Sequence, residues 1–119
     1  MKILLAEDET MCQNSIKNFC KKLEIEIDVA SNGQEALDFC KSGTTYELIL
    51  MDNYMPEMNG LQATEKIRGM SHGSSYNIIL LSGVEEMSEE EFKKYGFNAF
   101  CKKPLSKTVF EALINQYKK

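Results

Sequence analysis

The sequence predicts an α/β domain in which five strand–helix units build a parallel sheet with helices on both faces. Short apolar runs recur at spacings of roughly 20 to 30 residues, and segments with helical periodicity separate them. The chain has 119 residues, 43% hydrophobic and 27% charged, which is enough for one domain with its own core. We therefore expect a single domain over residues 1–119, with no output domain in this chain.

The first half of the chain supplies two of the strands. The apolar run 3–6 predicts a short buried strand, and the next segment has one apolar helical face, made of Cys12, Ile16, Phe19, Cys20 and Leu23. The stretch 25–29 alternates between apolar and charged residues, which predicts a half-exposed strand near an edge of the sheet. After a turn at 31–33, a short helix is expected over 34–40.

The third strand is the run 48–51, which leads directly into Asp52. Four consecutive apolar residues predict a strand buried on both faces. Pro56 and Gly60 shape the turn behind it, and Asn59 is a suitable cap for a helix over 60–68.

The second half of the chain repeats the pattern twice. A buried strand over 77–81 ends on Ser82, and Ser88 with Glu91 forms a capping-box sequence for a helix over 89–95. A short strand over 97–101 ends on Lys102, Lys103 and Pro104. Ser106 can cap the last helix, whose inward stripe is predicted to be Val109, Phe110, Leu113, Ile114 and Tyr117.

Polar residues follow four of the predicted strands: Glu7 and Asp8, Asp52, Ser82, and Lys103. Because parallel strands end at the same edge of a sheet, these side chains should meet in one crevice. Each residue also has a plainer interpretation. The acids and Ser82 suit solvated turns or helix starts, and Lys103 suits an ordinary surface position, with Lys102 beside it as a competitor.

Three carboxylates in one crevice repel one another unless a cation joins them. Hard oxygen ligands with open positions suit Mg²⁺, and Mn²⁺ would also fit. Asp52 would then be a carboxylate nucleophile that takes a phosphoryl group. Lys103 would pair with the phosphate oxygens, and Ser82 would offer a hydroxyl donor.

Composition excludes several other classes of function. The net charge of −4 and the pI of about 5.1 argue against a nucleic-acid or membrane-surface binder, which needs a basic face. No run of about 18 apolar residues occurs, so we expect a cytoplasmic location. The cysteines are best interpreted as small buried hydrophobes in a reducing compartment rather than as a zinc site or disulfides: Cys12, Cys20, Cys40 and Cys101.

Five stretches of the sequence carry a family resemblance: 3–9, 32–37, 50–60, 80–83 and 103–104. Through them the chain resembles, over essentially its whole length, the receiver domain of two-component response regulators. The most specific piece is Asp-x-x-Met-Pro-x-Met-x-Gly, which begins at Asp52. The resemblance implies a flavodoxin-like (βα)₅ sheet with strand order 2-1-3-4-5.

The resemblance also implies a role for each site residue. Asp52 would accept a phosphoryl group from a phosphohistidine on a sensor histidine kinase or a histidine phosphotransfer protein. Asp8 would bind Mg²⁺ directly and Glu7 mainly through water, and the backbone carbonyl of Tyr54 would complete the metal site. The remaining matches are the switch hydroxyl, the aromatic switch position and the phosphate-binding lysine: Ser82, Phe100 and Lys103.

The sequence departs from the family pattern at several positions. Glu7 stands where Asp is common, a variant familiar in hybrid kinases. The sequence leaves two alternatives open, a free regulator and the cytoplasmic part of a larger membrane-bound kinase. Gly83 replaces the usual Ala, and Phe100 lacks the hydroxyl of a Tyr. Tyr54 and Val84 flank the position where water would attack the acyl phosphate, and their bulk is expected to slow autodephosphorylation.

Two other functions stay open. A phosphatase with an aspartate nucleophile needs a second Asp two residues after Asp52, and that position is Tyr54. A receiver-like domain used only for protein interaction should lack site residues, and none is missing. Homodimerisation is conceivable through the fourth helix, fifth strand and fifth helix, whose charges are mixed: Glu85, Glu86, Glu89, Glu90, Glu91, Lys93, Lys94, Lys102 and Lys107.

Overall fold

Five parallel strands form one sheet in residues 1–83 and 87–118, which the computed structural model describes. The strands are β1 (Lys2–Ala6), β2 (Glu26–Ala30), β3 (Leu48–Asp52), β4 (Ile78–Ser82) and β5 (Ala99–Lys102). Their order is β2-β1-β3-β4-β5, which confirms the predicted flavodoxin-like topology. Val84, Glu85 and Glu86, used in the sequence argument, lie outside the described residues, as does Lys119.

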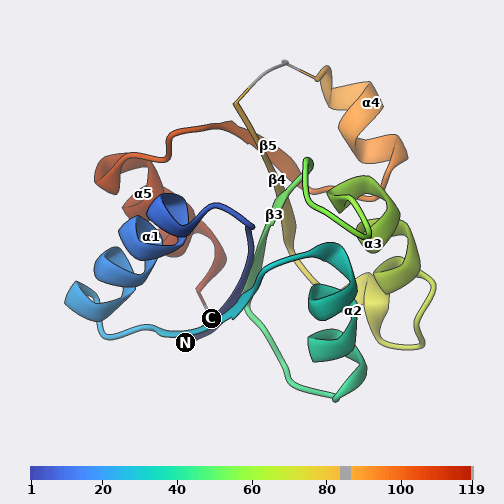
Figure 1. Ribbon diagram of the computed structural model, residues 1–119, viewed down its shortest axis with the longest axis horizontal. Coiled ribbons are helices and arrows are strands. Elements are labelled where there is room, and N and C mark those ends of the chain that lie inside the picture. The colour runs from blue at the N-terminus through green and yellow to red at the C-terminus, as the bar shows by residue number, and fades with distance from the viewer. Residues whose placement is uncertain (84–86, 119) are drawn as a thin grey trace.

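Helices cover both faces of the sheet (Figure 1). They are α1 (Thr10–Lys22), α2 (Gly33–Lys41), α3 (Gly60–Arg68), α4 (Glu89–Lys94) and α5 (Lys107–Tyr117), with a 3₁₀ turn, η1, at Gly73–Ser75. In Figure 1, α1 and α5 lie on one side of the sheet, and α2, α3 and α4 lie on the other. None of the helices in the described residues is long and apolar enough to cross a membrane.

The central strands are buried on both faces, which explains their continuous apolar runs. Side chains alternate between two core clusters. Ile3, Leu5, Leu48 and Leu50 belong to the cluster that includes residues of α1 and α5. The other cluster includes residues of α2 and α3, and the alternate residues of the same two strands belong to it: Leu4, Ala6, Ile49 and Met51.

Two residues predicted to face the core are exposed. Leu23 is 37% exposed because α1 ends at Lys22, and Leu23 is its C-cap residue rather than part of its last turn. Val109 is 43% exposed, whereas Phe110, Leu113 and Ile114 are buried. At 3.6 residues per turn, Val109 lies roughly 90° from the centre of that buried stripe. Both predictions were therefore wrong.

The helix caps are partly as predicted. Ser88 Oγ accepts from the Glu91 amide at 3.2 Å. The Ser88 hydroxyl donates to Glu91 Oε1 at 3.1 Å, so among the described contacts the Glu91 carboxylate bonds to this hydroxyl rather than to the Ser88 amide, as a capping box would require. The full box occurs at α3 instead. There the Asn59 side chain accepts from the Gln62 amide at 2.8 Å, and the Gln62 side chain accepts from the Asn59 amide at 3.1 Å.

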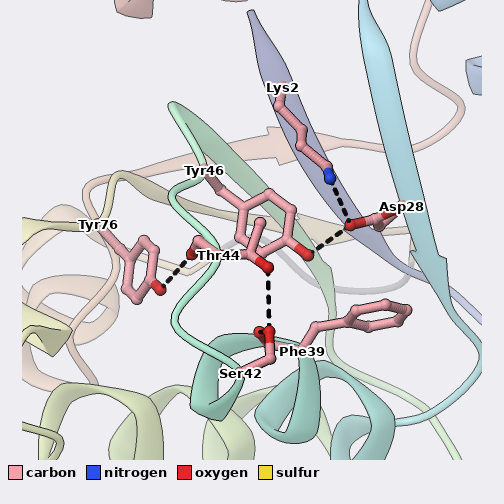
Figure 2. Close-up of polar contacts among 7 residues, drawn as sticks. All are labelled: Lys2, Asp28, Phe39, Ser42, Thr44, Tyr46 and Tyr76. Carbon is pink, nitrogen blue, oxygen red and sulfur yellow. Dashed lines mark hydrogen bonds and ion pairs between the residues drawn. The ribbon is translucent and has the colours of Figure 1, made fainter.

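A polar network ties the loop before β3 to the strands at the end of the sheet where β1 begins (Figure 2). Asp28 accepts from the Tyr46 hydroxyl at 2.6 Å and pairs with Lys2 at 3.4 Å. The Tyr76 hydroxyl donates to the Thr44 carbonyl at 3.0 Å. These contacts hold the loop at the edge opposite to the strand ends that carry the predicted site.

A second polar network surrounds the end of α3. The Arg68 guanidinium donates to the carbonyls of Gly73, Tyr76 and Gly96 at 2.7, 2.7 and 2.8 Å. It also donates to Asn98 Oδ1 at 2.8 Å. One half-buried side chain thus joins α3 to η1, to the start of β4 and to the segment between α4 and β5.

Candidate functional site

The ends of β1 and β3 bring two carboxylates together. Ala6 pairs with Met51 in the parallel register, so Glu7 and Asp52 follow at neighbouring positions. Glu7 is 1% exposed and Asp52 is 3% exposed, whereas Asp8 is exposed to solvent. One carboxylate oxygen from each of these residues lies within 4.8 Å of the other two. We call Glu7, Asp8 and Asp52 the acidic site.

Lys103 supplies the positive charge beside this site. Its Nζ lies 2.7 Å from Glu7 Oε1 and 3.4 Å from Asp52 Oδ2. Ser82 pairs with Lys102 in the sheet, and the Lys103 amide donates to the Ser82 carbonyl at 2.9 Å. This register places Lys103 one residue beyond β5. The side chain of Lys102 is exposed, so the structure favours Lys103 of the two lysines.

Burial controls the electrostatics of the acidic site. Burial, followed by the neighbouring Glu7 carboxylate, raises the pKa of Asp52 from 3.8 to about 7, and Lys103 opposes this shift. For Lys103, burial lowers the pKa, but Glu7 and Asp52 outweigh burial and raise it. The ammonium group therefore stays charged and acts as the internal cation of the crevice.

The donor set fits a hard divalent cation. Three carboxylates with one lysine leave an excess of negative charge. The second oxygen of Glu7, Oε2, is buried and has no hydrogen-bond partner among the described residues. Buried carboxylate oxygens normally have a hydrogen-bond partner. Because this oxygen has none among the described residues, a cation or a water bound to a cation would supply the missing partner.

The loop between β3 and α3 approaches Asp52 closely. The Gly60 amide donates to the Asn53 carbonyl at 2.9 Å, and a Cβ at Gly60 would overlap the Asp52 carbonyl oxygen. Glycine is thus required because the helix start packs directly on the end of the strand. Tyr54 lies in this loop and is 54% exposed. The sequence predicted the turn at Gly60 but not its close contact with Asp52.

The two predicted switch residues lie on neighbouring strands. Ser82 ends β4 and is buried. Phe100 pairs with Leu80 in the sheet register, is half-buried, and packs against the core cluster that includes residues of α2 and α3. The structure therefore places Ser82 at the strand end beside Lys103, with Phe100 two positions before Lys102 on the adjacent strand.

Sequence reasoning missed a group next to the acidic site. Cys12, interpreted as a buried hydrophobe, is only partly buried, and its thiol donates to Glu9 Oε1 at 3.0 Å. Burial and the carboxylates of Glu9 and Glu7 raise the pKa of Cys12 to about 12. Cys20 and Cys40 are buried as predicted, and Cys101 is half-buried. All four cysteines are free thiols.

Known proteins are similar to this chain along almost its full length. The family model of the response regulator receiver domain matches residues 3–115. Two-component response regulator 24 of Arabidopsis thaliana is 39% identical over 113 residues, 95% of this chain and 81% of that protein. The autoinducer 2 sensor kinase/phosphatase LuxQ of Vibrio parahaemolyticus is 31% identical over 119 residues, which are 99% of this chain but 14% of that kinase.

Solved structures with the same fold come from bacteria and yeast. The receiver domain of the Pseudomonas aeruginosa sensor histidine kinase PA1611 superposes with a TM-score of 0.87 at 26% identity, covering 98% of this chain and 95% of that one. It has magnesium coordinated in its active-site cleft. The receiver domain of Saccharomyces cerevisiae Ssk1, bound to the histidine phosphotransfer protein Ypd1, has a TM-score of 0.89 at 24% identity, with 98% and 88% coverage.

Proposed function

Because the chain belongs to the family of response regulator receiver domains, we propose that it is a signalling switch that accepts a phosphoryl group on Asp52. Receiver domains are typically phospho-acceptors rather than turnover enzymes. The observation that carries the proposal is the position of Asp52. It is a buried carboxylate at the end of the central strand, with an acidic pair on one side and the Lys103 ammonium at 3.4 Å.

The transfer step uses the Asp52 carboxylate as the nucleophile. One of its oxygens attacks the phosphorus of a phosphohistidine, so a P–O bond forms while the P–N bond breaks. The electron pair of the broken bond stays on the imidazole nitrogen, which takes up a proton. The product on this chain is an acyl phosphate at Asp52, and its hydrolysis by water would return the free carboxylate.

Mg²⁺, or Mn²⁺, would be held by Asp8, Asp52 and Glu7, with the Tyr54 backbone carbonyl as a further ligand. Such an ion neutralises the carboxylates and the phosphoryl oxygens. Support comes from the oxygen donor set, from the unpartnered Glu7 Oε2, and from the magnesium in the related Pseudomonas receiver domain.

Lys103 and Ser82 would bind the phosphoryl oxygens once the group is attached to Asp52. Lys103 would exchange its contact with Asp52 Oδ2 for a phosphoryl oxygen, and the Ser82 hydroxyl would donate to another. Movement of the Ser82 segment would let Phe100, which is half-buried, turn further inward. Phosphorylation would thereby shift a pre-existing equilibrium between inactive and active conformations.

The partner that donates the phosphoryl group is proposed to be a sensor histidine kinase or a histidine phosphotransfer protein. The Ssk1 receiver domain bound to Ypd1 gives this proposal a structural precedent, and the match with LuxQ supports a kinase context. Homodimerisation through α4, β5 and α5 is a further proposal, as is a cytoplasmic location for the domain. The charges on the described part of that face are of both signs, and Lys93 pairs with Glu89 at 2.7 Å.

Labelling with a small phosphodonor tests the proposal directly. In the presence of Mg²⁺, acetyl phosphate should add one phosphoryl group to the protein, seen by intact mass, and EDTA should abolish the addition. Asp52→Asn should lose labelling, whereas Asp38→Asn, a change at an exposed aspartate of α2, should keep it. Full labelling of Asp52→Asn would contradict the proposal. Turnover of a phosphate monoester would favour a phosphatase, and no labelling of the wild type would favour an interaction-only domain.

A further inference from the structure

A second set of metal-ligating groups shares Glu7 with the acidic site. A carboxylate oxygen of Glu7, one of Glu9 and the Sγ of Cys12 all lie within 4.8 Å of one another. Glu9 is at the N-cap position of α1 and Cys12 lies in the first turn, a separation of three residues that puts both on one side of the helix. The Cys12 thiol proton is directed at Glu9 Oε1. A cation bound here would take the place of that proton.

These residues open into a cavity rather than into packed protein. A cavity with a volume of about 220 Å³ is lined by Glu7, Glu9 and Cys12. Its other walls come from α1 and from the segment after β5, and include Met11, Ser15, Pro104 and Leu105. Such a volume has room for a cation together with a water ligand.

The unpartnered oxygen of Glu7, which also supports the acidic site, is a second sign of a ligand beside Glu7. Glu7 is 1% exposed, and its Oε1 is satisfied by Lys103 at 2.7 Å. Its Oε2 has no hydrogen-bond partner among the described residues, which is costly for a buried carboxylate. A cation bound to Glu7 would supply the missing partner of this oxygen. Asp8 and Asp52 complete one set of donors, and Glu9 and Cys12 complete the other.

The chemistry of the two sets differs. Carboxylates alone suit Mg²⁺, which avoids sulfur, whereas a thiolate with two carboxylates suits Zn²⁺ and similar borderline metals. Three protein ligands would leave one tetrahedral position for water. Two carboxylates and a thiolate carry three negative charges, and Lys103 beside Glu7 offsets one of them. The remaining two negative charges match the charge of a divalent cation.

We propose that Glu7, Glu9 and Cys12 form a second cation site, selective for Zn²⁺ over Mg²⁺, and that its occupation withholds Glu7 from the acidic site. Binding at this site is independent of the proposed function. The inhibitory consequence, a slower acceptance of the phosphoryl group by Asp52, rests on the proposed function.

Cobalt absorption spectroscopy tests the binding claim. Co²⁺ added to the wild-type protein should produce a thiolate-to-cobalt charge-transfer band in the near ultraviolet, and Zn²⁺ should displace it. Cys12→Ser should lose the band and weaken Zn²⁺ binding, measured by calorimetry, by at least about tenfold. Glu9→Gln should also weaken Zn²⁺ binding. Cys101→Ser, at the other partly buried cysteine, should behave as the wild type.

Three results would overturn the site. They are the absence of the band in a folded wild-type protein, loss of the band in Cys101→Ser instead of Cys12→Ser, and Zn²⁺ affinity that depends on Asp8 but not on Cys12. Melting curves recorded for each variant separate loss of a ligand from loss of the fold.

The inhibitory consequence has its own measurement. In excess Mg²⁺, Zn²⁺ should slow labelling by acetyl phosphate in the wild type and have little effect in Cys12→Ser. If Co²⁺ binds through Cys12 but labelling is equally fast with and without Zn²⁺, the regulatory claim fails while the site stands. If no labelling occurs under any condition, the proposed function fails, and the cobalt band still decides the site.

Discussion

The ammonium group of Lys103 lies 2.7 Å from Glu7 Oε1, although 96 positions separate the two residues in the chain. Glu7 follows β1 and Lys103 follows β5, and β3 and β4 lie between those strands in the sheet. The same ammonium is 3.4 Å from Asp52 Oδ2, so one lysine serves two buried carboxylates. In the metal-free protein, Lys103 is therefore the cation that offsets the repulsion between the two buried carboxylates.

Replacing Lys103 by Met should lower the free energy of unfolding of the metal-free protein by about 3 kcal/mol, because two buried carboxylates would lose their shared cation. Urea denaturation in EDTA measures this effect. Mg²⁺ should then stabilise Lys103→Met more than it stabilises the wild type, since the variant has no competing ammonium. The control is Lys102→Met, an exposed neighbour, which should change stability by no more than about 0.5 kcal/mol. Equal losses in both variants would contradict the assignment of Lys103.

Asp52 should make the stability of the metal-free protein depend on pH. Its pKa is raised from 3.8 to about 7 by burial and by Glu7, so the folded state binds the proton more tightly than the unfolded state. The free energy of unfolding therefore falls as the pH rises through this window. Asp52→Asn should be more stable than the wild type above pH 7, by up to about 4 kcal/mol, and the two should converge near pH 4.

Denaturation of both proteins at several pH values in EDTA measures the difference. Asp38→Asn, at an exposed aspartate of α2, is the matched control for the loss of a carboxylate. A wild type that gains stability relative to Asp52→Asn between pH 4 and pH 7 would contradict the raised pKa.

Gly60→Ala should disturb both the fold and the site. The added Cβ would overlap the Asp52 carbonyl oxygen, so either the start of α3 or the end of β3 must move, at a cost of about 1–3 kcal/mol. Labelling of Asp52 by acetyl phosphate should slow as well. The matched control is Gly69→Ala at the other end of α3, where the nearest atom to a Cβ, the Lys66 carbonyl oxygen, is 3.5 Å away. That variant should keep wild-type stability and labelling, and equal behaviour of the two would argue against the close contact.

Arg68→Met should destabilise the protein by about 2–4 kcal/mol, because the carbonyls of Gly73, Tyr76 and Gly96 would each lose a hydrogen bond from the guanidinium. Thermal denaturation measures the loss, and Lys66→Met, an exposed cation in the same helical turn, is the control. Hydrogen exchange should also quicken in α4, which has no buried residue among those described and is joined to α3 through Gly96. Unchanged protection there would show that Arg68 does not anchor this helix.

The order of the elements could be predicted from the sequence because its signals are local. The strands predicted at 3–6, 48–51 and 77–81 each rest on a continuous apolar run, which indicates a strand covered on both faces. The structure has β1, β3 and β4 there within one residue at each end. Turn and cap residues located the helix starts for the same reason, since Asn59 and Ser106 bond to amides three residues away. Polar residues at strand ends predicted which side chains would share an edge of the sheet. Their chemical roles remain predictions.

Tertiary structure decided what depends on how the strands pair and how the helices lie on them. The register of β4 with β5 determines that Lys103, and not Lys102, lies beside Glu7 and Asp52. The position of α1 over the end of β1 brings Cys12 and Glu9 to Glu7, which no spacing in the sequence indicated. Burial then sets the electrostatics of Asp52, because exclusion of solvent disfavours its charged form and is the largest cause of its raised pKa. The contacts of Lys103 join residues far apart in the chain, and those of Cys12 depend on how α1 packs, so only the packed fold specifies them.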